Sequence, residues 1–134
     1  MVYVFTDDTW IEEYVAANYG WTGKVKAVKR SAESASDTAS TEMAMKELAE
    51  ALQYKFDSIT LLQATSPLTT KADINESIRM IESGYDSVLS VVKTHRFIWT
   101  KEGKSVNYDY MKRPRRQDFA GTFIENGAVY TAKK

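Results

Sequence analysis

The stretch ITLLQATSPL, residues 59–68, sets the architecture that the rest of the chain implies. Ile59–Leu62 is a short apolar run with β-branched members, which predicts a buried strand. The polar Gln63 follows at once, and Pro67 holds Ser66 in an extended conformation, so the strand ends in a polar loop. Ligands collect beyond such strand ends in parallel α/β sheets, so this stretch predicts one edge of a binding crevice.

Gln63 and Thr65 also have a simpler interpretation. Polar side chains at a strand end need hydrogen-bond partners whatever the function, so these two could equally satisfy the loop backbone and cap the next helix. The local chemistry leaves both interpretations open.

Strand-like and helix-like segments alternate over the first 92 residues. We expect strands at Val2–Phe5, Val25–Val28, Ile59–Leu62 and Ser87–Val92, the last buried on both faces, and helices at Thr9–Tyr19, around Met45–Leu52 and from Thr70 to Gly84. This alternation predicts right-handed βαβ units and a three-layer α/β domain with a mainly parallel sheet.

Local signals refine two of these helices. The first places Trp10, Tyr14 and Ala17 on one face and has Gly20 where a C-cap glycine is expected. The helix after residue 70 begins with Thr70 and Asp73 at capping-box spacing.

The pattern changes after residue 92. Phe97–Trp99 and Val106–Tyr108 resemble a hairpin with its turn at Gly103, and Phe123–Tyr130 reads as a last strand interrupted at Asn126-Gly127. We find no internal linker, so residues 1–134 are expected to form a single domain.

Composition excludes several classes of protein. The 134 residues carry 18 basic and 18 acidic side chains, a balance that does not suit a nucleic-acid binder, and there is no cysteine. The start MVYVFTDD is neither a signal peptide nor a membrane span, and no later run reaches about 18 apolar residues. We therefore expect a cytoplasmic protein with no membrane partner.

Motifs for common chemistries are also absent. The six glycines form neither GxGxxG nor GxxxxGK, and His95 is the only histidine, which argues against a His-rich metal site and a Ser-His-Asp triad. Asp7 and Asp8 read as a turn. The basic cluster KRPRRQDF, residues 112–119, could face a polyanion, a targeting receptor, solvent or an acidic substrate.

Four stretches together resemble the acylneuraminate cytidylyltransferases, most closely the animal-type branch. They are SDTAST (36–41), LLQATSPL (61–68), SVLSVV (87–92) and RPRRQDFAGTFIENGAVY (113–130). The order and spacing of these stretches, which cover essentially the whole chain, make the resemblance specific.

The resemblance implies a Rossmann-like enzyme that joins CTP to a sialic-type nine-carbon keto acid with Mg²⁺. It implies that Arg30, Ala39 and Thr41 contact the nucleotide, and that the acidic sugar is bound by Gln63, Arg116, Gln117, Asn126 and Tyr130. It also implies a homodimer, in which the arm 97–119 carries Arg116 and Gln117 into the partner's site.

The chain departs from the family pattern at three points. A loop of the type PARxGSKxxxxKN, which cradles the triphosphate, and a strand of the type SxDIDT, which holds the metal, are both missing. Ile124 stands where many bacterial members have an arginine. We therefore expect a central piece of the enzyme, without metal ligands or an assignable catalytic residue, that is inactive alone.

Two alternatives remain beside the enzyme. One is a noncatalytic module of the same fold that binds nucleotide or acidic sugar or serves assembly. The other is contact with nucleic acid or an import receptor through residues 112–116, which would fit a nuclear rather than a cytoplasmic protein.

Overall fold

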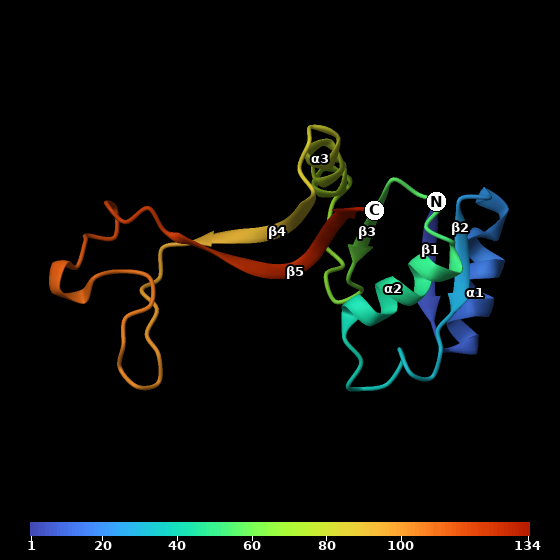
Figure 1. The fold of residues 1–134 in the computed structure, drawn as a ribbon, viewed down its shortest axis with the longest axis horizontal. Coiled ribbons are helices and arrows are strands. Elements are labelled where there is room, and N and C mark those ends of the chain that lie inside the picture. The colour runs from blue at the N-terminus through green and yellow to red at the C-terminus, as the bar shows by residue number, and fades with distance from the viewer. The chain divides into compact units, whose positions relative to one another are not determined.

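A computed structural model describes all of residues 1–134 and divides them into two compact units, residues 1–56 and 57–134 (Figure 1). Each unit combines strands with helices, so the predicted α/β class is confirmed in that coarse sense. The single domain over residues 1–134 stays a prediction.

The first unit is built on a strand–helix–strand motif. Its elements are β1 (Val2–Thr6), α1 (Thr9–Tyr19), a 3-10 turn (Gly20–Thr22), β2 (Val25–Lys29) and α2 (Thr41–Ala51). β1 and β2 pair in parallel, with Val2 opposite Val25 and Thr6 opposite Lys29, and α1 packs against both strands. Two parallel strands joined by a helix form the βαβ unit that the alternation predicts.

Helix α1 has the predicted bounds. The Asp8 side chain caps it by accepting hydrogen bonds from the backbone N–H of Trp10 at 2.7 Å and of Ile11 at 3.4 Å. Gly20 is the C-cap residue but has helical geometry, with φ −57°. The chain reverses only at Gly23, where φ is +65°, a conformation that suits glycine.

The aromatic face of α1 is not its packing face. Trp10 and Tyr14 are 68% and 47% exposed and stack on each other with ring centroids 5.4 Å apart, whereas Val15 is buried. The sequence groups Trp10 and Tyr14 correctly on one face, but that face lies on the surface of this unit.

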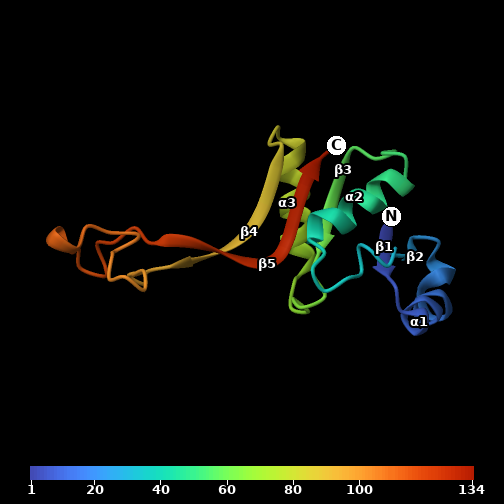
Figure 2. The ribbon, with the colours of Figure 1, turned by 60° about the horizontal axis from the view of Figure 1, so that its bottom comes forward.

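The second unit contains one antiparallel sheet with a helix packed against it. Its elements are β3 (Ser58–Leu62), α3 (Lys71–Glu82), β4 (Ser87–Thr94), a 3-10 turn (Tyr110–Lys112) and β5 (Thr122–Lys133). The strand order is β3-β5-β4, and β5 runs antiparallel to both neighbours (Figure 2). The predicted mainly parallel sheet is therefore wrong for this unit, because the returning strand β5 lies between the two βα strands.

A chain of hydroxyl groups crosses the core of the second unit. Thr131, 1% exposed, donates to the Ser77 hydroxyl of α3 at 3.0 Å and lies 3.1 Å from the Thr60 hydroxyl of β3. Ser77 in turn donates to the Ile74 carbonyl at 2.8 Å. Each buried hydroxyl thus has a partner, as buried polar groups require.

Helix α3 begins with the predicted capping box. The Thr70 hydroxyl accepts from the Asp73 N–H at 3.3 Å, and the Asp73 carboxylate accepts from the Thr70 N–H at 2.8 Å. The sequence signal is fully confirmed here because both partners are local.

The outer ends of β4 and β5 form a two-stranded ribbon beyond β3. Residues 129–133 of β5 pair with β3, while residues 122–125 pair only with 91–94 of β4. On β4, Leu89, Val91 and Val92 are 44%, 40% and 54% exposed, so the prediction of a strand buried on both faces is wrong. Helix α3 contacts β4, but these three side chains are not covered within this unit.

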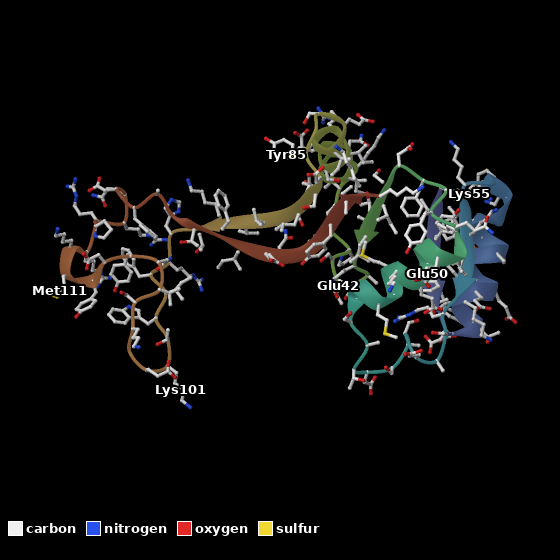
Figure 3. All side chains as sticks on the ribbon, in the orientation of Figure 1. Glu42, Glu50, Lys55, Tyr85, Lys101 and Met111 are labelled. Carbon is white, nitrogen blue, oxygen red and sulfur yellow. The ribbon has the colours of Figure 1, made fainter.

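The connection between β4 and β5, residues 95–121, contains the predicted hairpin turn. Val106 donates to the Ile98 carbonyl and Thr100 to the Lys104 carbonyl, each at 2.8 Å, and Gly103 has φ +77°. Figure 3 labels Lys101 at the tip of this turn and Met111, which lies in the 3-10 turn Tyr110–Lys112.

An aromatic cluster and one asparagine hold this connection together. The Phe97 ring lies 4.4 Å from the Tyr108 ring and 5.1 Å from the Phe119 ring, centroid to centroid. The Asn107 side chain accepts from Ile98 N–H at 2.9 Å and donates to the Thr122 hydroxyl at 2.8 Å.

None of the helices is long and apolar enough to span a membrane.

Candidate functional site

The predicted site residues fall into three groups. Arg30, Ala39 and Thr41 lie in residues 1–56, whereas both sugar-contact groups lie in residues 57–134.

Arg30 stands just after β2 and opens the loop 31–40. Its backbone N–H donates to the Thr6 carbonyl at 2.9 Å, and its Nη2 donates to the carbonyl of the fully buried Ser34. The guanidinium lies 5.8 Å from the centre of the Phe5 ring. The Arg30 Nε is buried without a hydrogen-bond partner, so one donor of this arginine is unused.

Glu47 of α2 anchors the same loop from the other side. Its carboxylate accepts from the Ser31 N–H at 2.8 Å and from the Ser31 hydroxyl at 2.9 Å. The Ser34 hydroxyl, followed by Ser31 and the nearby Arg30 cation, lowers the pKa of Glu47 below its ordinary 4.5 against the effect of desolvation. Glu47 is therefore ionised at neutral pH, and no local sequence signal marks a contact 16 residues away.

Ala39 and Thr41 close the loop at its other end. Ala39 is half-buried and donates its N–H to the Ser36 carbonyl at 3.0 Å, while Thr41 is the exposed first residue of α2. Ser40 between them caps the helix by accepting from the Met43 N–H at 3.2 Å. The structure therefore joins Arg30 to Ser34 within the loop but shows no direct bond from Arg30 to Ala39 or Thr41.

Gln63 lies at the end of β3 against the middle of β5. Its N–H donates to the Ala128 carbonyl at 3.4 Å. Gly127 has φ +72°, and a Cβ at this position would lie 3.1 Å from Gln63 Oε1. Glycine at 127 thus permits both the local turn of the chain and the close approach of the Gln63 amide.

Asn126 lies in a bulge of several residues in β5. Leu89 pairs with Tyr130 and Val91 with Glu125, so residues 126–129 of β5 stand opposite Ser90 alone. The interruption predicted at Asn126-Gly127 is confirmed as this bulge.

A short hydrogen-bond network fixes the bulge. The Ser90 hydroxyl donates to Asn126 Oδ1 at 2.6 Å and accepts from the Val129 N–H at 2.9 Å. Asn126 Oδ1 also accepts from the Ala128 N–H at 3.2 Å. The sequence analysis missed Ser90, which lies 36 residues before its partner.

Tyr130 lies in the same region of β5. It pairs with Leu61 of β3 and Leu89 of β4, and its hydroxyl donates to Glu125 Oε2 at 3.2 Å. The structure therefore gathers three predicted sugar contacts, Gln63, Asn126 and Tyr130, around the bulge.

Arg116 and Gln117 lie elsewhere, in the connection beyond the ribbon. Both are exposed, and neither side chain forms a hydrogen bond or ion pair, with the bulge or with any other residue. Arg115 pairs with Asp118 at 2.6 Å, and the Arg113 guanidinium lies 4.7 Å from the centre of the Phe97 ring. Arg113 and Arg115 thus have structural partners, whereas Arg116 remains available.

The chain's own residues do not fit a metal ion. Residues 1–134 contain no group of three or more His, Cys, Asp or Glu side chains that could hold one. Proteins usually hold Mg²⁺ through one or two carboxylates together with water and substrate phosphates, and we assign no such ligand among these residues.

Three known proteins to which this chain is similar all carry the same enzyme name. The chain is 37% identical over 141 aligned positions to the zebrafish (Danio rerio) protein named N-acylneuraminate cytidylyltransferase A, and 39% identical over 137 to that of Oncorhynchus mykiss named N-acylneuraminate cytidylyltransferase. A second zebrafish protein, N-acylneuraminate cytidylyltransferase B, is 36% identical over 137. The chain is similar to one part of these N-acylneuraminate cytidylyltransferases.

The matches cover a different fraction of this chain than of its relatives. They cover 96–99% of this chain but 30–31% of each cytidylyltransferase. The chain therefore spans about a third of the length of the curated relatives it matches, and the resemblance inferred from the four motifs is confirmed over nearly all of it. No protein-family model matches the chain.

Proposed function

We propose that this chain forms the base-binding and sugar-binding parts of an enzyme that transfers CMP from CTP to a sialic-type nine-carbon keto acid. The observation that carries the proposal is the similarity of 96–99% of the chain to proteins named N-acylneuraminate cytidylyltransferase. A Rossmann-like sheet in the complete protein and a cytoplasmic or nuclear location belong to the same proposal.

Base selection is assigned to Arg30 and the loop it opens. Arg30 stands directly after β2, and its guanidinium carries donors that suit the acceptor atoms of a nucleotide base. A site built to hydrogen-bond one base rejects another because its own polar groups go unpaired, at about 1–3 kcal/mol per group. CTP should therefore outcompete UTP in the complete protein that contains residues 1–134.

The test is competition between CTP and UTP in that protein and in Arg30→Ala. We expect a preference for CTP that weakens by roughly ten-fold or more in the variant. Equal binding of the two nucleotides, or unchanged CTP affinity in Arg30→Ala, would count against the assignment.

Sugar recognition is assigned to Gln63, Asn126 and Tyr130. Their amide and hydroxyl groups offer both donors and acceptors to a polyhydroxylated acid, and the bulge holds them near one another. Gln63→Ala should lower catalytic efficiency by about one to two decades. Full activity combined with a lower melting temperature would instead support the structural role of Gln63.

We also propose a two-fold dimer in which Arg116 and Gln117 serve the partner's sugar site. Arg116 offers an unpaired planar fork for a carboxylate. The ribbon and connection that carry it expose Phe123 at 65%, Met111 at 76% and Tyr110 at 59%, apolar area that a second subunit would cover.

Subunit complementation tests the dimer. Arg116→Ala and Gln63→Ala subunits, each nearly inactive, should regain activity when mixed, because a mixed dimer contains one intact site. A monomer at micromolar concentration, or no recovery after demonstrated subunit exchange, would refute the shared site.

Transfer of CMP requires positive charge against the triphosphate and, in this family, Mg²⁺. Residues 1–134 offer neither a phosphate-cradling glycine motif nor a metal-ligand cluster, so we expect negligible turnover from this chain alone. A second candidate is a noncatalytic module of the same fold that binds nucleotide or acidic sugar. Binding of both ligands by the complete protein without product formation would select that candidate.

A further inference from the structure

We propose that Ser90 is a positioning residue that orients the Asn126 carboxamide, so that both N–H donors of its amide face the acidic sugar. The inference rests on the sugar site proposed above. It adds Ser90 of β4, which lies outside the predicted site. It also specifies that Asn126 recognises the sugar as a hydrogen-bond donor.

Two backbone N–H groups determine the direction of the network. The Val129 N–H can only donate, so the Ser90 hydroxyl, 2.9 Å away, accepts from it and keeps its own proton for Asn126. That proton requires an acceptor at 2.6 Å, which must be the carboxamide oxygen. The Ala128 N–H, 3.2 Å from the same atom, independently requires an oxygen there.

The oxygen of Asn126 is therefore occupied within the fold. Its Nδ2 forms no hydrogen bond in the structure, and the residue is exposed, so two N–H donors are presented outward. Such a group recognises an acceptor oxygen, either the carboxylate or a hydroxyl of the sugar acid.

Ser90 matters because a terminal carboxamide otherwise rotates freely between two arrangements. Without the hydroxyl, only the longer contact to Ala128 holds Asn126 Oδ1 in place. Rotation would then turn the oxygen outward, where it repels a carboxylate and cannot donate to a hydroxyl. Loss of Ser90 should therefore weaken sugar binding through Asn126, although Ser90 itself does not touch the sugar.

The experiment measures binding of N-acetylneuraminic acid by calorimetry to the complete protein that contains residues 1–134. We expect Ser90→Ala to weaken binding by about 3- to 10-fold, the range for loss of one hydrogen bond, and Ser90→Thr, which keeps the hydroxyl, to restore it. Ser87→Ala on the same strand is the matched control, because the Ser87 hydroxyl has no partner, and it should leave binding unchanged.

Two further variants separate positioning from folding. In an Asn126→Ala background, Ser90→Ala should cause no additional loss of affinity, because the residue through which it acts is gone. Asn126→Asp keeps the acceptor for Ser90 and Ala128 but removes both donors, so it should bind the sugar at least about 10-fold more weakly. This variant tests the direction of recognition even if Ser90→Ala does not fold.

The outcomes are distinguishable. Equal losses from Ser90→Ala with and without Asn126, or unweakened binding by Asn126→Asp, would overturn the inference. Unchanged affinity in Ser90→Ala while Gln63→Ala weakens binding would overturn this inference alone. No binding by the unaltered protein would overturn the proposed sugar site as well.

Discussion

Gly127→Ala should separate the backbone role of the bulge from its role at the Gln63 side chain. Gly127 has φ +72°, and an added Cβ would lie 3.1 Å from Gln63 Oε1. The substitution thus imposes a left-handed conformation on a residue with a side chain and pushes the Gln63 amide back by a few tenths of an ångström.

We expect Gly127→Ala to lower both the melting temperature and the affinity for the sugar. The left-handed conformation costs a non-glycine residue about 1–2 kcal/mol, which corresponds to a melting temperature lower by roughly 3–8 °C for a protein of this size. Displacement of Gln63 from one sugar hydrogen bond should weaken sugar binding by roughly 3- to 10-fold.

Gly103→Ala is the matched control. Gly103 has φ +77°, nearly the same strain, but a Cβ added there would meet no atom within 4 Å. Calorimetry should therefore show a similar loss of melting temperature in both variants and weaker binding of N-acetylneuraminic acid only in Gly127→Ala. Equal affinities in the two variants would refute the argument that glycine at 127 makes room for Gln63.

Two other substitutions address the second unit's stability. Thr131→Val should lower the free energy of unfolding by about 1–3 kcal/mol, because it removes the hydrogen bond to Ser77 and leaves the half-buried Thr60 hydroxyl without its partner; denaturant titration that shows no loss would contradict this. Hydrogen bonds from the Thr70 hydroxyl and, as the smaller effect, from the Thr70 N–H lower the pKa of Asp73 below its ordinary 3.8. The ionised Asp73 side chain therefore contributes its full stabilisation of the fold above pH 3.8. This contribution is lost as the pH falls through the lower pKa of the folded state. Asp73→Asn should flatten this acid limb of the stability–pH curve, and an unchanged limb would show that the capping box does not contribute.

Local signals predicted local structure well. The bounds of α1 and the capping box of α3 follow from residues at most four positions apart, and the structure reproduces both. The Asn126-Gly127 interruption was likewise predicted, because these residue types favour positive φ and break a strand.

Strand order and burial were not predictable in the same way. β5 enters between β3 and β4 because the long connection returns it antiparallel, and no local pattern records which gap a returning strand fills. The apolar run of β4 indicated burial on both faces, yet burial depends on what covers the strand, and Leu89, Val91 and Val92 are exposed in this unit.

The candidate site shows the same division. The place of Gln63 at a strand end is visible locally and left its role open, whereas the assignment of Gln63 and Asn126 as sugar contacts came from the family resemblance. The sequence could not supply Glu47 or Ser90, whose roles depend on partners 16 and 36 residues away. Residue type alone does not distinguish such a serine from any other serine on a strand.

Product formation tests the central claim most directly. The complete protein that contains residues 1–134 is incubated with CTP, Mg²⁺ and N-acetylneuraminic acid, and the products are separated and identified by mass. The account predicts a CMP-linked sugar acid together with an equal amount of pyrophosphate, both strongly reduced in Gln63→Ala. A folded protein that yields neither product, or that yields both at the same rate in Gln63→Ala, would contradict it.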